Sequence, residues 1–333
     1  MTDGSIRVSR IRVPAEWSEQ RRLFTAWPSH VELWQEDLQQ ARSEVAAMVR
    51  ALAAGQAVTV IACGAEALTT ANESLGGVAR IVSAPFGDIW VRDTGPIFAG
   101  VDGQLTAIRF RNNGWGGKYA LPNDDAIGDE IAALADTPAI QHEFILEGGA
   151  LEHNGEGWVL TTRQCLLNPN RNPGWTQELA ERHLQESLGC KRVLWLQEGL
   201  LNDHTDGHVD NLARFIGADT VVCQHASGAD DPNADLYKRI AIELASQGLQ
   251  VCTIPSPGRV LSEDGEVMPA SHMNFIIGNH AVVVPVYGTA SSEEAVSLLQ
   301  QLFPDRQVLG VRSNALLTGG GSFHCITQQE PAL

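Results

Sequence analysis

The chain is short of positive charge. Only 23 Lys and Arg residues stand against 40 Asp and Glu residues, which gives a formal net charge of −17. A negative field of this size repels nucleic acid and acidic membrane surfaces, so it argues against a DNA- or RNA-binding protein. Many soluble enzymes are acidic for solubility alone, and the charge therefore identifies no ligand by itself.

Cysteine is scarce and widely spread. The six cysteines include no CxxC pair, and the nearest two, Cys165 and Cys190, are 25 positions apart. This spacing argues against a zinc finger or ribbon, and a chain of 333 residues does not need disulfides to fold. Most of the cysteines lie in or beside apolar, β-rich stretches such as VTVIAC, where buried structural thiols are expected.

Long hydrophobic runs are missing. The longest, such as AVVVPVY at residues 281–287, are too short to cross a bilayer, and the opening MTDGSIRVSRIR lacks the apolar stretch of a secretory signal. Hydrophobic residues make up 44% of the chain and charged residues 19%, the balance of a globular protein. No Pro/Gly/Ser-rich linker divides the sequence, so we expect one soluble, cytoplasmic domain over residues 1–333.

Helix-like and strand-like stretches alternate along the chain. Amphipathic periodicity predicts five helices, over Glu32–Ala54, Asp124–Leu134, Trp175–Leu188, Asp235–Gln247 and Ser291–Leu302. Their expected N-caps include Asp124, Thr176 and Ser291. Strand-like groups begin near residues 57, 142, 192, 250 and 307. Five such units predict an α/β protein with internally repeated architecture rather than a doubly wound sheet. Residues 109–119 are expected to form an ordered loop with aromatic anchors.

Polar residues gather where the predicted strands end. The segments are APFGDIWVRDTGP with Trp90 and Asp93, ILEGGAL with Glu147, LNDHTDGHVDNLARF with His204, His208 and Asp210, and LLTGGGSFHCITQQ with His324 and Cys325. Each residue has an ordinary explanation when it is taken singly: Asp93 suits a turn, Glu147 a surface loop, and a lone His208 a structural contact. The glycine run lacks the residues of a phosphate-binding loop. The functional prediction depends on their combination.

Two kinds of chemistry fit that combination. One is metal-dependent hydrolysis by His204, His208 and Asp210, since the two histidines have the i, i+4 spacing of zinc-binding HExxH. Against it, HTDGH places Gly and Asp where a helix is required, and the Glu base is missing. The other is nucleophilic catalysis by Cys325. A free thiol with a pKa of ~8.5 is only about 3% ionised at neutral pH, so it needs a positive neighbour. His208 is the candidate, because His324 is expected to face the other way if the stretch is extended.

Carboxylates surround this hypothetical thiolate. Asp93, Glu147 and Asp210 would oppose ionisation of Cys325 unless they serve a cationic substrate. A guanidinium resolves the conflict, because its N–H fork pairs with carboxylates and its charge helps the sulfur ionise. The residues therefore predict hydrolysis of a guanidinium group to a urea and ammonia.

Longer motifs carry a family resemblance. WVRDTGP, LEGGALE, HTDGHVDNLARF, PASHMNF and GGGSFHCITQQ, with PAEW and WPS near the start, resemble bacterial agmatine deiminases of the porphyromonas-type peptidylarginine deiminase branch of the guanidine-modifying superfamily. The resemblance covers residues 14–331 of this single deiminase domain. It implies a five-bladed α/β propeller with pseudo-fivefold symmetry, no metal or cofactor, and a possible homodimer.

The resemblance also implies residue roles. Cys325 would form an amidino-cysteine intermediate, and His208 would be the general acid and base. Asp93 and Asp210 would hold the guanidinium, Trp90 would line the pocket, and Glu147 would contact the substrate. The partner would be a small cationic guanidine, with neither nucleic acid nor membrane involved.

The implied reaction converts agmatine to N-carbamoylputrescine and ammonia. Peptidyl-arginine and free arginine are the alternative substrates within the same superfamily. A site for free arginine should supply a cation for its carboxylate. Arg92 and Arg214, the only arginines near the motifs, are instead expected to brace the scaffold, which favours agmatine.

Overall fold

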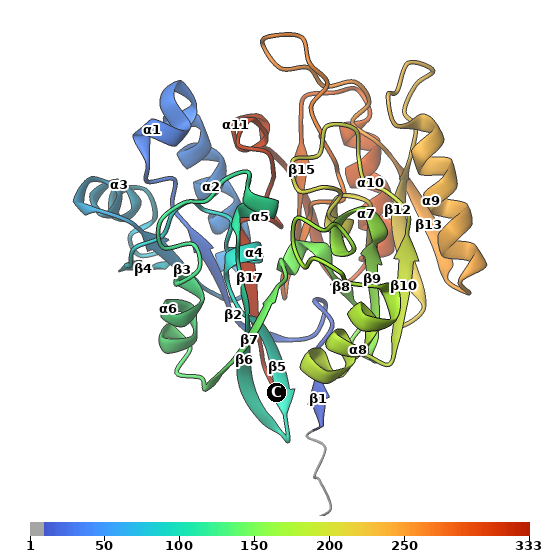
Figure 1. The fold of residues 1–333 in the computed structure, drawn as a ribbon. Helices are drawn as coiled ribbons and strands as arrows, with labels where there is room; N and C mark the ends of the chain where they lie inside the picture. Colours follow the sequence, from blue (N-terminus) through green and yellow to red (C-terminus); the bar gives the residue numbers. More distant parts are fainter. Residues whose placement is uncertain (1–9) are drawn as a thin grey trace, which may run out of the picture.

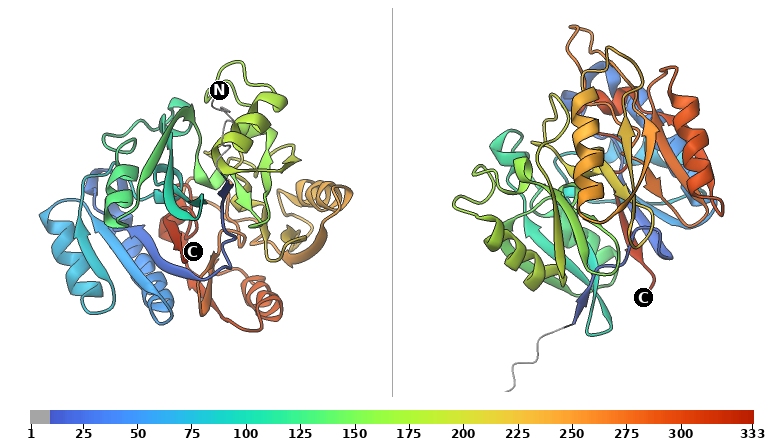
Figure 2. Two further views of the ribbon diagram at one scale, coloured as in Figure 1. Left: turned by 90° about the horizontal axis from the view of Figure 1, so that it is seen from below. Right: turned by 90° about the vertical axis from the view of Figure 1, so that its right-hand side faces the viewer.

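The computed structural model describes residues 10–333, so the greater part of the opening segment MTDGSIRVSRIR, on which the expectation about a secretory signal fell, lies outside the described residues. Within them the strands form five separate sheets. Seen from below, the sheets lie around a common centre, with helices such as α3, α9 and α10 on the outside (Figures 1 and 2). This is an α/β architecture, as the sequence predicts.

The sheets contain three or four strands each. In spatial order the strands are β17 (Thr327–Pro331), β2 (Gln20–Ala26), β3 (Ala57–Ala62) and β4 (Arg80–Ser83); β1 (Ile11–Arg12), β5 (Ile97–Val101), β6 (Gln104–Arg111) and β7 (Ala139–Ile145); β10 (Arg192–Leu196), β9 (Trp158–Thr162) and β8 (Glu152–His153); β11 (Ala213–Phe215), β12 (Thr220–His225) and β13 (Gln250–Pro255); and β14 (Ile276–Ile277), β15 (Ala281–Val286) and β16 (Gln307–Arg312).

The helices differ widely in length. The longer ones are α2 (Leu38–Ala53), α3 (Ala65–Leu75), α6 (Ile127–Leu134), α8 (Gln177–Leu188), α9 (Ala234–Ser246) and α10 (Ser292–Leu302). Short turns of helix are α1 (Val31–Trp34), α4 (Val91–Thr94), α5 (Gly114–Gly117), α7 (Arg163–Leu166) and α11 (Asn314–Thr318), with 3-10 turns η1 (Gln35–Asp37), η2 (Gly148–Ala150) and η3 (Val209–Asn211).

One structural unit recurs in all five sheets. An antiparallel pair of strands is followed by a helix and a parallel strand, as in β11, β12, α9 and β13. A parallel neighbour requires a crossover connection, and the helix supplies it. In one sheet the antiparallel partner of β2 is β17, from the other end of the chain. The C-terminal segment that carries Cys325 is thereby fixed against the start of the fold.

Three of the five predicted helices are confirmed, because α8, α9 and α10 begin and end within about two residues of their predicted bounds. The predicted helix over 32–54 is divided, since Gln35 has a φ of 46° that ends α1 before α2 begins. Sequence periodicity did not predict α3. Gly64, the residue before α3, has a φ of 89°. The helix itself, AEALTTANESL, mixes small and polar residues.

The predicted caps have mixed outcomes. Thr176 caps α8, its hydroxyl accepting a hydrogen bond from the Leu179 amide at 3.3 Å. Asp124 was wrong as a cap: α6 begins only at Ile127, and the buried Asp124 carboxylate accepts from the amide of Gly87 at 2.9 Å. Ser291 is at the N-cap position of α10, but its hydroxyl donates to the Ser256 carbonyl instead.

The described helices are not long and apolar enough for any of them to cross a membrane. Residues 109–119 are ordered, as expected: β6 continues to Arg111, and the remaining loop buries Trp115. The largest hydrophobic cluster joins α2, β2 and β3, and it extends to Trp90 and Cys325. Cys325, the candidate nucleophile, therefore packs against the hydrophobic core.

Candidate active site

A cavity of about 240 Å³ lies beside Cys325. Its walls are mainly aromatic and aliphatic, its floor is a glycine run, and its acidic groups are Asp88 and Asp93. The lining residues are Leu33, Asp88, Trp90, Asp93, Trp115, Tyr119, Leu121, His204, Thr205, Thr318, Gly319, Gly320, Gly321 and Cys325. Within the described part of the chain, this lining contains no Lys or Arg.

Cys325 is held by Asn274. The side-chain amide of Asn274 donates to Cys325 Sγ at 3.1 Å, and its oxygen accepts from the backbone amides of Cys325 and His324 at 3.2 and 3.0 Å. These bonds fix both the backbone and the sulfur. Asn274 lies in the PASHMNF motif, which contributed to the family resemblance, but no role was predicted for Asn274 from the sequence. Its polar side chain between buried apolar neighbours was the signal that could have revealed it.

Asp210 lies beside the sulfur. Its Oδ2 is 3.7 Å from Cys325 Sγ and 2.8 Å from Nδ1 of His324, while its buried Oδ1 has no partner among the described residues. His324 does face away from the cavity, its Nε2 bonding Glu16 at 2.9 Å. The expected reason was wrong, because the residues around Cys325 form turns rather than an extended strand.

His208 forms a buried pair with Glu147. Its Nε2 donates to Glu147 Oε2 at 3.2 Å, and its Nδ1 is 3.7 Å from Asp93 Oδ2 with no hydrogen-bond partner among the described residues. Its own backbone amide donates to the Thr205 hydroxyl at 3.0 Å. Glu147, like His208 and Asp210, is absent from the cavity lining, and it contacts the imidazole of His208 on the Nε2 side; its role as a substrate contact stays a prediction.

Gly149 allows three polar groups to pack against the backbone. A β-carbon there would lie 2.7 Å from His208 Nδ1, 2.8 Å from Asp93 Oδ1 and 3.1 Å from Asp210 Oδ2. His208, Asp93 and Asp210 therefore cluster around Gly149, more closely than any larger residue would permit. Asp93 is fixed beside it, because its Oδ1 accepts from the Gly149 amide at 2.9 Å and its Oδ2 accepts from the Trp115 indole at 2.8 Å.

Trp90 forms the wall above the glycine run. Its indole donates to Asp88 at 2.8 Å, which fixes the ring. A β-carbon at Gly321 would lie 2.6 Å from the Trp90 ring and 3.2 Å from Cys325 Sγ. The glycine run thus allows the backbone, the indole and the sulfur to approach closely.

The electrostatics oppose a resting thiolate. Burial raises the pKa of Cys325 well above its usual value, and the negative charges of Asp210 and Asp93 raise it further. Burial lowers the pKa of His208, but Asp93 and the bonds to Cys165 and Glu147 outweigh this and raise it well above its usual value. Burial also raises the pKa of Asp93. A cation that entered this space would reverse the balance.

The alternative metal ligands do not come together. His204 is exposed and stacks on Tyr119 at the cavity mouth, with ring centroids 6.0 Å apart, whereas His208 is fully buried. HTDGH forms turns, as expected, and not a helix. Within residues 10–333, the one group of three possible metal ligands is Glu147, Cys165 and His208, and the Glu147 carboxylate there is already bound by the guanidinium of Arg171.

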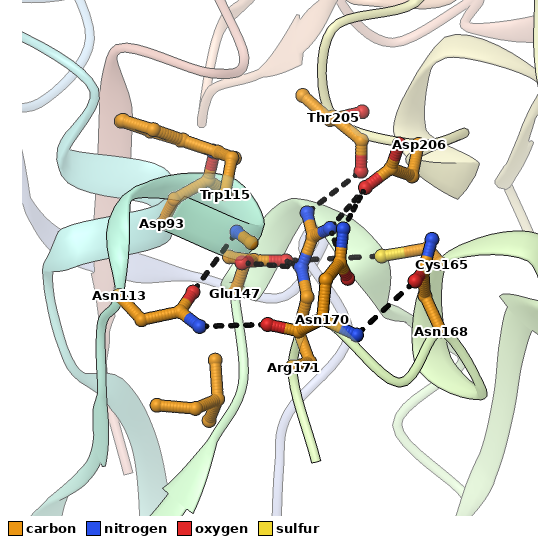
Figure 3. A network of polar contacts seen from close by, with 12 residues as sticks. Asp93, Asn113, Trp115, Glu147, Cys165, Asn168, Asn170, Arg171, Thr205 and Asp206 are labelled. Atoms are coloured by element: carbon orange, nitrogen blue, oxygen red, sulfur yellow. Dashed lines mark hydrogen bonds and ion pairs between the residues drawn. The ribbon is translucent and has the colours of Figure 1, made fainter. Parts of the chain in front are cut away.

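Sequence reasoning missed the residues behind the catalytic groups. Figure 3 shows Arg171 bonded to Glu147 and to the segment of Thr205 and Asp206, and a further dashed line joins the thiol of Cys165 to the Glu147 carboxylate. Trp115 was expected only as an aromatic anchor, yet it binds Asp93. These partners are distant in sequence, so no local pattern reveals them.

Comparison with known proteins agrees with this geometry. Residues 12–331 match the Porphyromonas-type peptidyl-arginine deiminase family. The chain belongs to this family. A curated member, an agmatine deiminase from Stutzerimonas stutzeri, is 35% identical over 96% of this chain and 95% of its own length. Another agmatine deiminase, from Pseudomonas aeruginosa, is 32% identical over 98% of this chain and 97% of its own length.

Solved structures of the family are also similar. A Cys-to-Ser variant of the C. jejuni agmatine deiminase with substrate bound has a TM-score of 0.92 at 28% identity, covering 99% of each chain. An amidinotransferase from Microseira wollei has a TM-score of 0.52 at 10% identity over 96% of each chain, a likeness of fold alone.

Proposed function

We propose that this chain hydrolyses the guanidinium group of agmatine to N-carbamoylputrescine and ammonia, with Cys325 as the covalent nucleophile. The observation that carries the proposal is the cluster of His208, Asp93 and Asp210 around Gly149, with Asp210 Oδ2 3.7 Å from Cys325 Sγ and both Asp93 and Cys325 lining the cavity. Full-length relatives named agmatine deiminase support the choice of substrate.

The guanidinium binds between Asp93 and Asp210. Its planar fork of N–H donors suits two carboxylates, and Asp210 Oδ1 is an acceptor without a partner among the described residues. Trp90 and the glycine run confine the other face of the group. The bound cation offsets the two negative charges that hold the Cys325 thiol protonated, so substrate binding favours loss of the thiol proton to solvent and formation of the nucleophilic thiolate.

Catalysis then has two halves. Cys325 Sγ, as thiolate, adds to the guanidinium carbon, and His208 Nδ1–H protonates the departing amine, which leaves as ammonia. The neutral His208 next takes a proton from water, whose oxygen attacks the carbon of the amidino-cysteine and releases the urea product. Glu147 orients His208 through Nε2, so Nδ1 stays directed at the reacting space.

The lack of a Lys or Arg among the described lining residues favours agmatine over free arginine. Arg92 donates to the carbonyl of His324, and Arg214 is fully buried between Glu16 and Glu152, so both arginines brace the scaffold. The substrate carboxylate of arginine would meet Asp88 and apolar walls instead. Burying a charge without a partner costs several kcal/mol, so we expect agmatine to be preferred about 100-fold or more in kcat/KM.

A kinetic comparison of agmatine, free arginine and a blocked arginine peptide tests this proposal through ammonia release. We expect turnover with agmatine well above the other two. Equal or better turnover of arginine or of the peptide would overturn the choice of agmatine. No ammonia from any of the three would overturn the deiminase function.

We also propose that the five sheets are the blades of one α/β propeller with pseudo-fivefold symmetry. The recurrence of one strand–strand–helix–strand unit in every sheet supports this arrangement. The site residues come from several sheets and their connections, and this supports a position of the reaction near the common centre of the five sheets.

A further inference from the structure

Arg171 lies behind the catalytic pair, and the proposed mechanism gives it no role. It follows the short helix α7, its side chain is 2% exposed, and it does not line the cavity. All three guanidinium nitrogens are nevertheless engaged (Figure 3). Nε donates to the Glu147 oxygens at 3.0 and 3.3 Å, Nη1 to the carboxylate of Asp206, and Nη2 to the carbonyl of Thr205 at 2.8 Å.

The two sides of this guanidinium lead to different parts of the site. On the inner side, Glu147 receives the Nε2–H of His208. On the outer side, Thr205 lines the cavity, and Asp206 also accepts from Lys118 Nζ at 2.6 Å. Arg171 therefore connects the cavity mouth to the Glu147 side of the pair, in addition to the direct bond from the His208 backbone amide to the Thr205 hydroxyl.

The positive charge of Arg171 affects the pKa of the Glu147 carboxylate, which binds His208. Burial by itself raises the pKa of Glu147, but the hydrogen bond from His208 and the positive charge of Arg171 outweigh it and hold that pKa below its usual value. A buried carboxylate that loses its cation is costly. Lysine would supply the charge but not the planar fork that reaches Glu147, Asp206 and Thr205 together.

We infer that Arg171 is a positioning residue for the deimination: its guanidinium holds the Glu147 carboxylate against His208 Nε2 and ties this pair to the cavity mouth at Thr205 and Asp206. The inference rests on the proposed function for its kinetic consequence. Because Arg171 acts through Glu147 and not on the substrate, its loss affects kcat far more than KM.

Two substitutions distinguish the effect of the charge of Arg171 from the effect of its planar guanidinium. Arg171→Met removes both, and Arg171→Lys keeps only the charge. We expect kcat for agmatine to fall about 100-fold in Arg171→Met with KM little changed, because the pair loses its alignment. We expect a bell-shaped dependence of kcat on pH, with a lower and an upper limit. In Arg171→Met both limits should move up by about one pH unit or more, because removal of a nearby cation raises the pKa of both Glu147 and His208. Arg171→Lys should keep the wild-type pH limits while kcat still falls.

Asp206→Asn is the second variant, and it changes the charge on the outer side. Removal of this negative charge should move both pH limits down, by less than Arg171→Met moves them up. Arg239→Met, which removes an exposed arginine paired with Glu198, is the matched control and should leave the profile unchanged. Shifts of opposite sign cannot come from a general loosening of the fold.

Titration of the His208 ring nitrogens by NMR in a Cys325→Ser background measures the same shifts without turnover. An unchanged pH profile in Arg171→Met, or wild-type kcat in Arg171→Lys, would make Arg171 a structural brace only. If Arg171→Met does not fold, the absence of a downward shift in Asp206→Asn overturns the inference. If the wild type releases no ammonia from any guanidine, the proposed function fails, and the NMR titration still decides the role of Arg171.

Discussion

At the scale of single residues, the nucleophile is surrounded by groups that suppress it. Burial and the carboxylates of Asp210 and Asp93 keep the Cys325 thiol protonated, and they become favourable only when a guanidinium lies between them. We therefore expect this arrangement to restrict reactivity to cationic substrates. Asn274 holds the sulfur in place in the meantime, through its contact at 3.1 Å.

The first prediction concerns the nucleophile itself. Cys325→Ser should abolish turnover and leave the fold intact, because a serine hydroxyl is far less ionised than a thiol in the same buried position. Mass spectrometry of the quenched wild-type reaction should show an amidine-sized adduct on the Cys325 peptide. Substantial activity in the serine variant, with no adduct in the wild type, would rule out covalent catalysis.

The second prediction concerns the two carboxylates. Asp93→Asn and Asp210→Asn each replace a charged acceptor by a neutral amide that faces a cation, and charge-assisted bonds are worth ~1.5–3 kcal/mol. We expect kcat/KM for agmatine to fall about tenfold to 150-fold, and further if alignment is lost. Asp235→Asn, at an exposed ion pair with Lys238, is the control. Near-normal kinetics in both site variants would remove them from the substrate contacts.

At the scale of elements, short turns rather than long helices carry the site. The 3-10 turn η2 carries Gly149, the 3-10 turn η3 carries Asp210, and the four-residue helix α4 carries Asp93. The long helices α8, α9 and α10 instead cover the sheets that hold these turns. Precision therefore comes from close packing of small connections on rigid sheets.

The third prediction tests that packing at η2. Gly149→Ala would place a methyl group 2.7 Å from His208 Nδ1 and 2.8 Å from Asp93 Oδ1, so these side chains would have to shift. Activity should fall by more than about 100-fold, and overpacking should cost about 1–3 kcal/mol of unfolding free energy. Gly217→Ala is the matched control, since its new methyl group would meet only Thr220, at 3.4 Å. Normal agmatine kinetics in Gly149→Ala would show that the reaction does not depend on the present positions of His208 and Asp93.

At the scale of the whole molecule, a buried ionic network joins distant parts of the chain beneath the site. Arg214 on β11 binds Glu152 on β8 at 2.8 Å and also binds Glu16 near the start of the fold. Glu16 in turn bonds His324, next to the nucleophile. The network thus connects the early segment, the middle sheets and the C-terminal segment.

The fourth prediction follows from this burial. Arg214→Met would leave two buried carboxylates without their cation, which should lower the free energy of unfolding by about 3–5 kcal/mol in urea denaturation. Arg239→Met breaks an exposed ion pair with Glu198, and it should cost less than about 1 kcal/mol. Equal losses in the two variants would contradict a special structural role for the network.

The sequence by itself determined the alternation of helices and strands and the identity of the polar motifs. Apolar periodicity is a local property of the sequence, so it located α8, α9 and α10. The alternation of helix-like and strand-like stretches predicted an α/β fold. Periodicity did not predict the break at Gln35, where φ is 46°. It could not identify the partner of Asp124, because Gly87 lies 37 positions away. The prediction of guanidinium chemistry at Cys325, His208 and the nearby carboxylates came from the combination of these residue types, and their individual roles came from the family resemblance of the longer motifs.

Only the tertiary structure decided how these groups face one another. It placed Glu147 behind His208, separated His204 from His208 and Asp210, and turned His324 toward Glu16. Arg171 was invisible in the sequence because its partners lie 24 to 35 positions away on separate connections. Residue type fixes what a side chain can do, whereas burial and long-range contacts fix its charge, its direction and its partner.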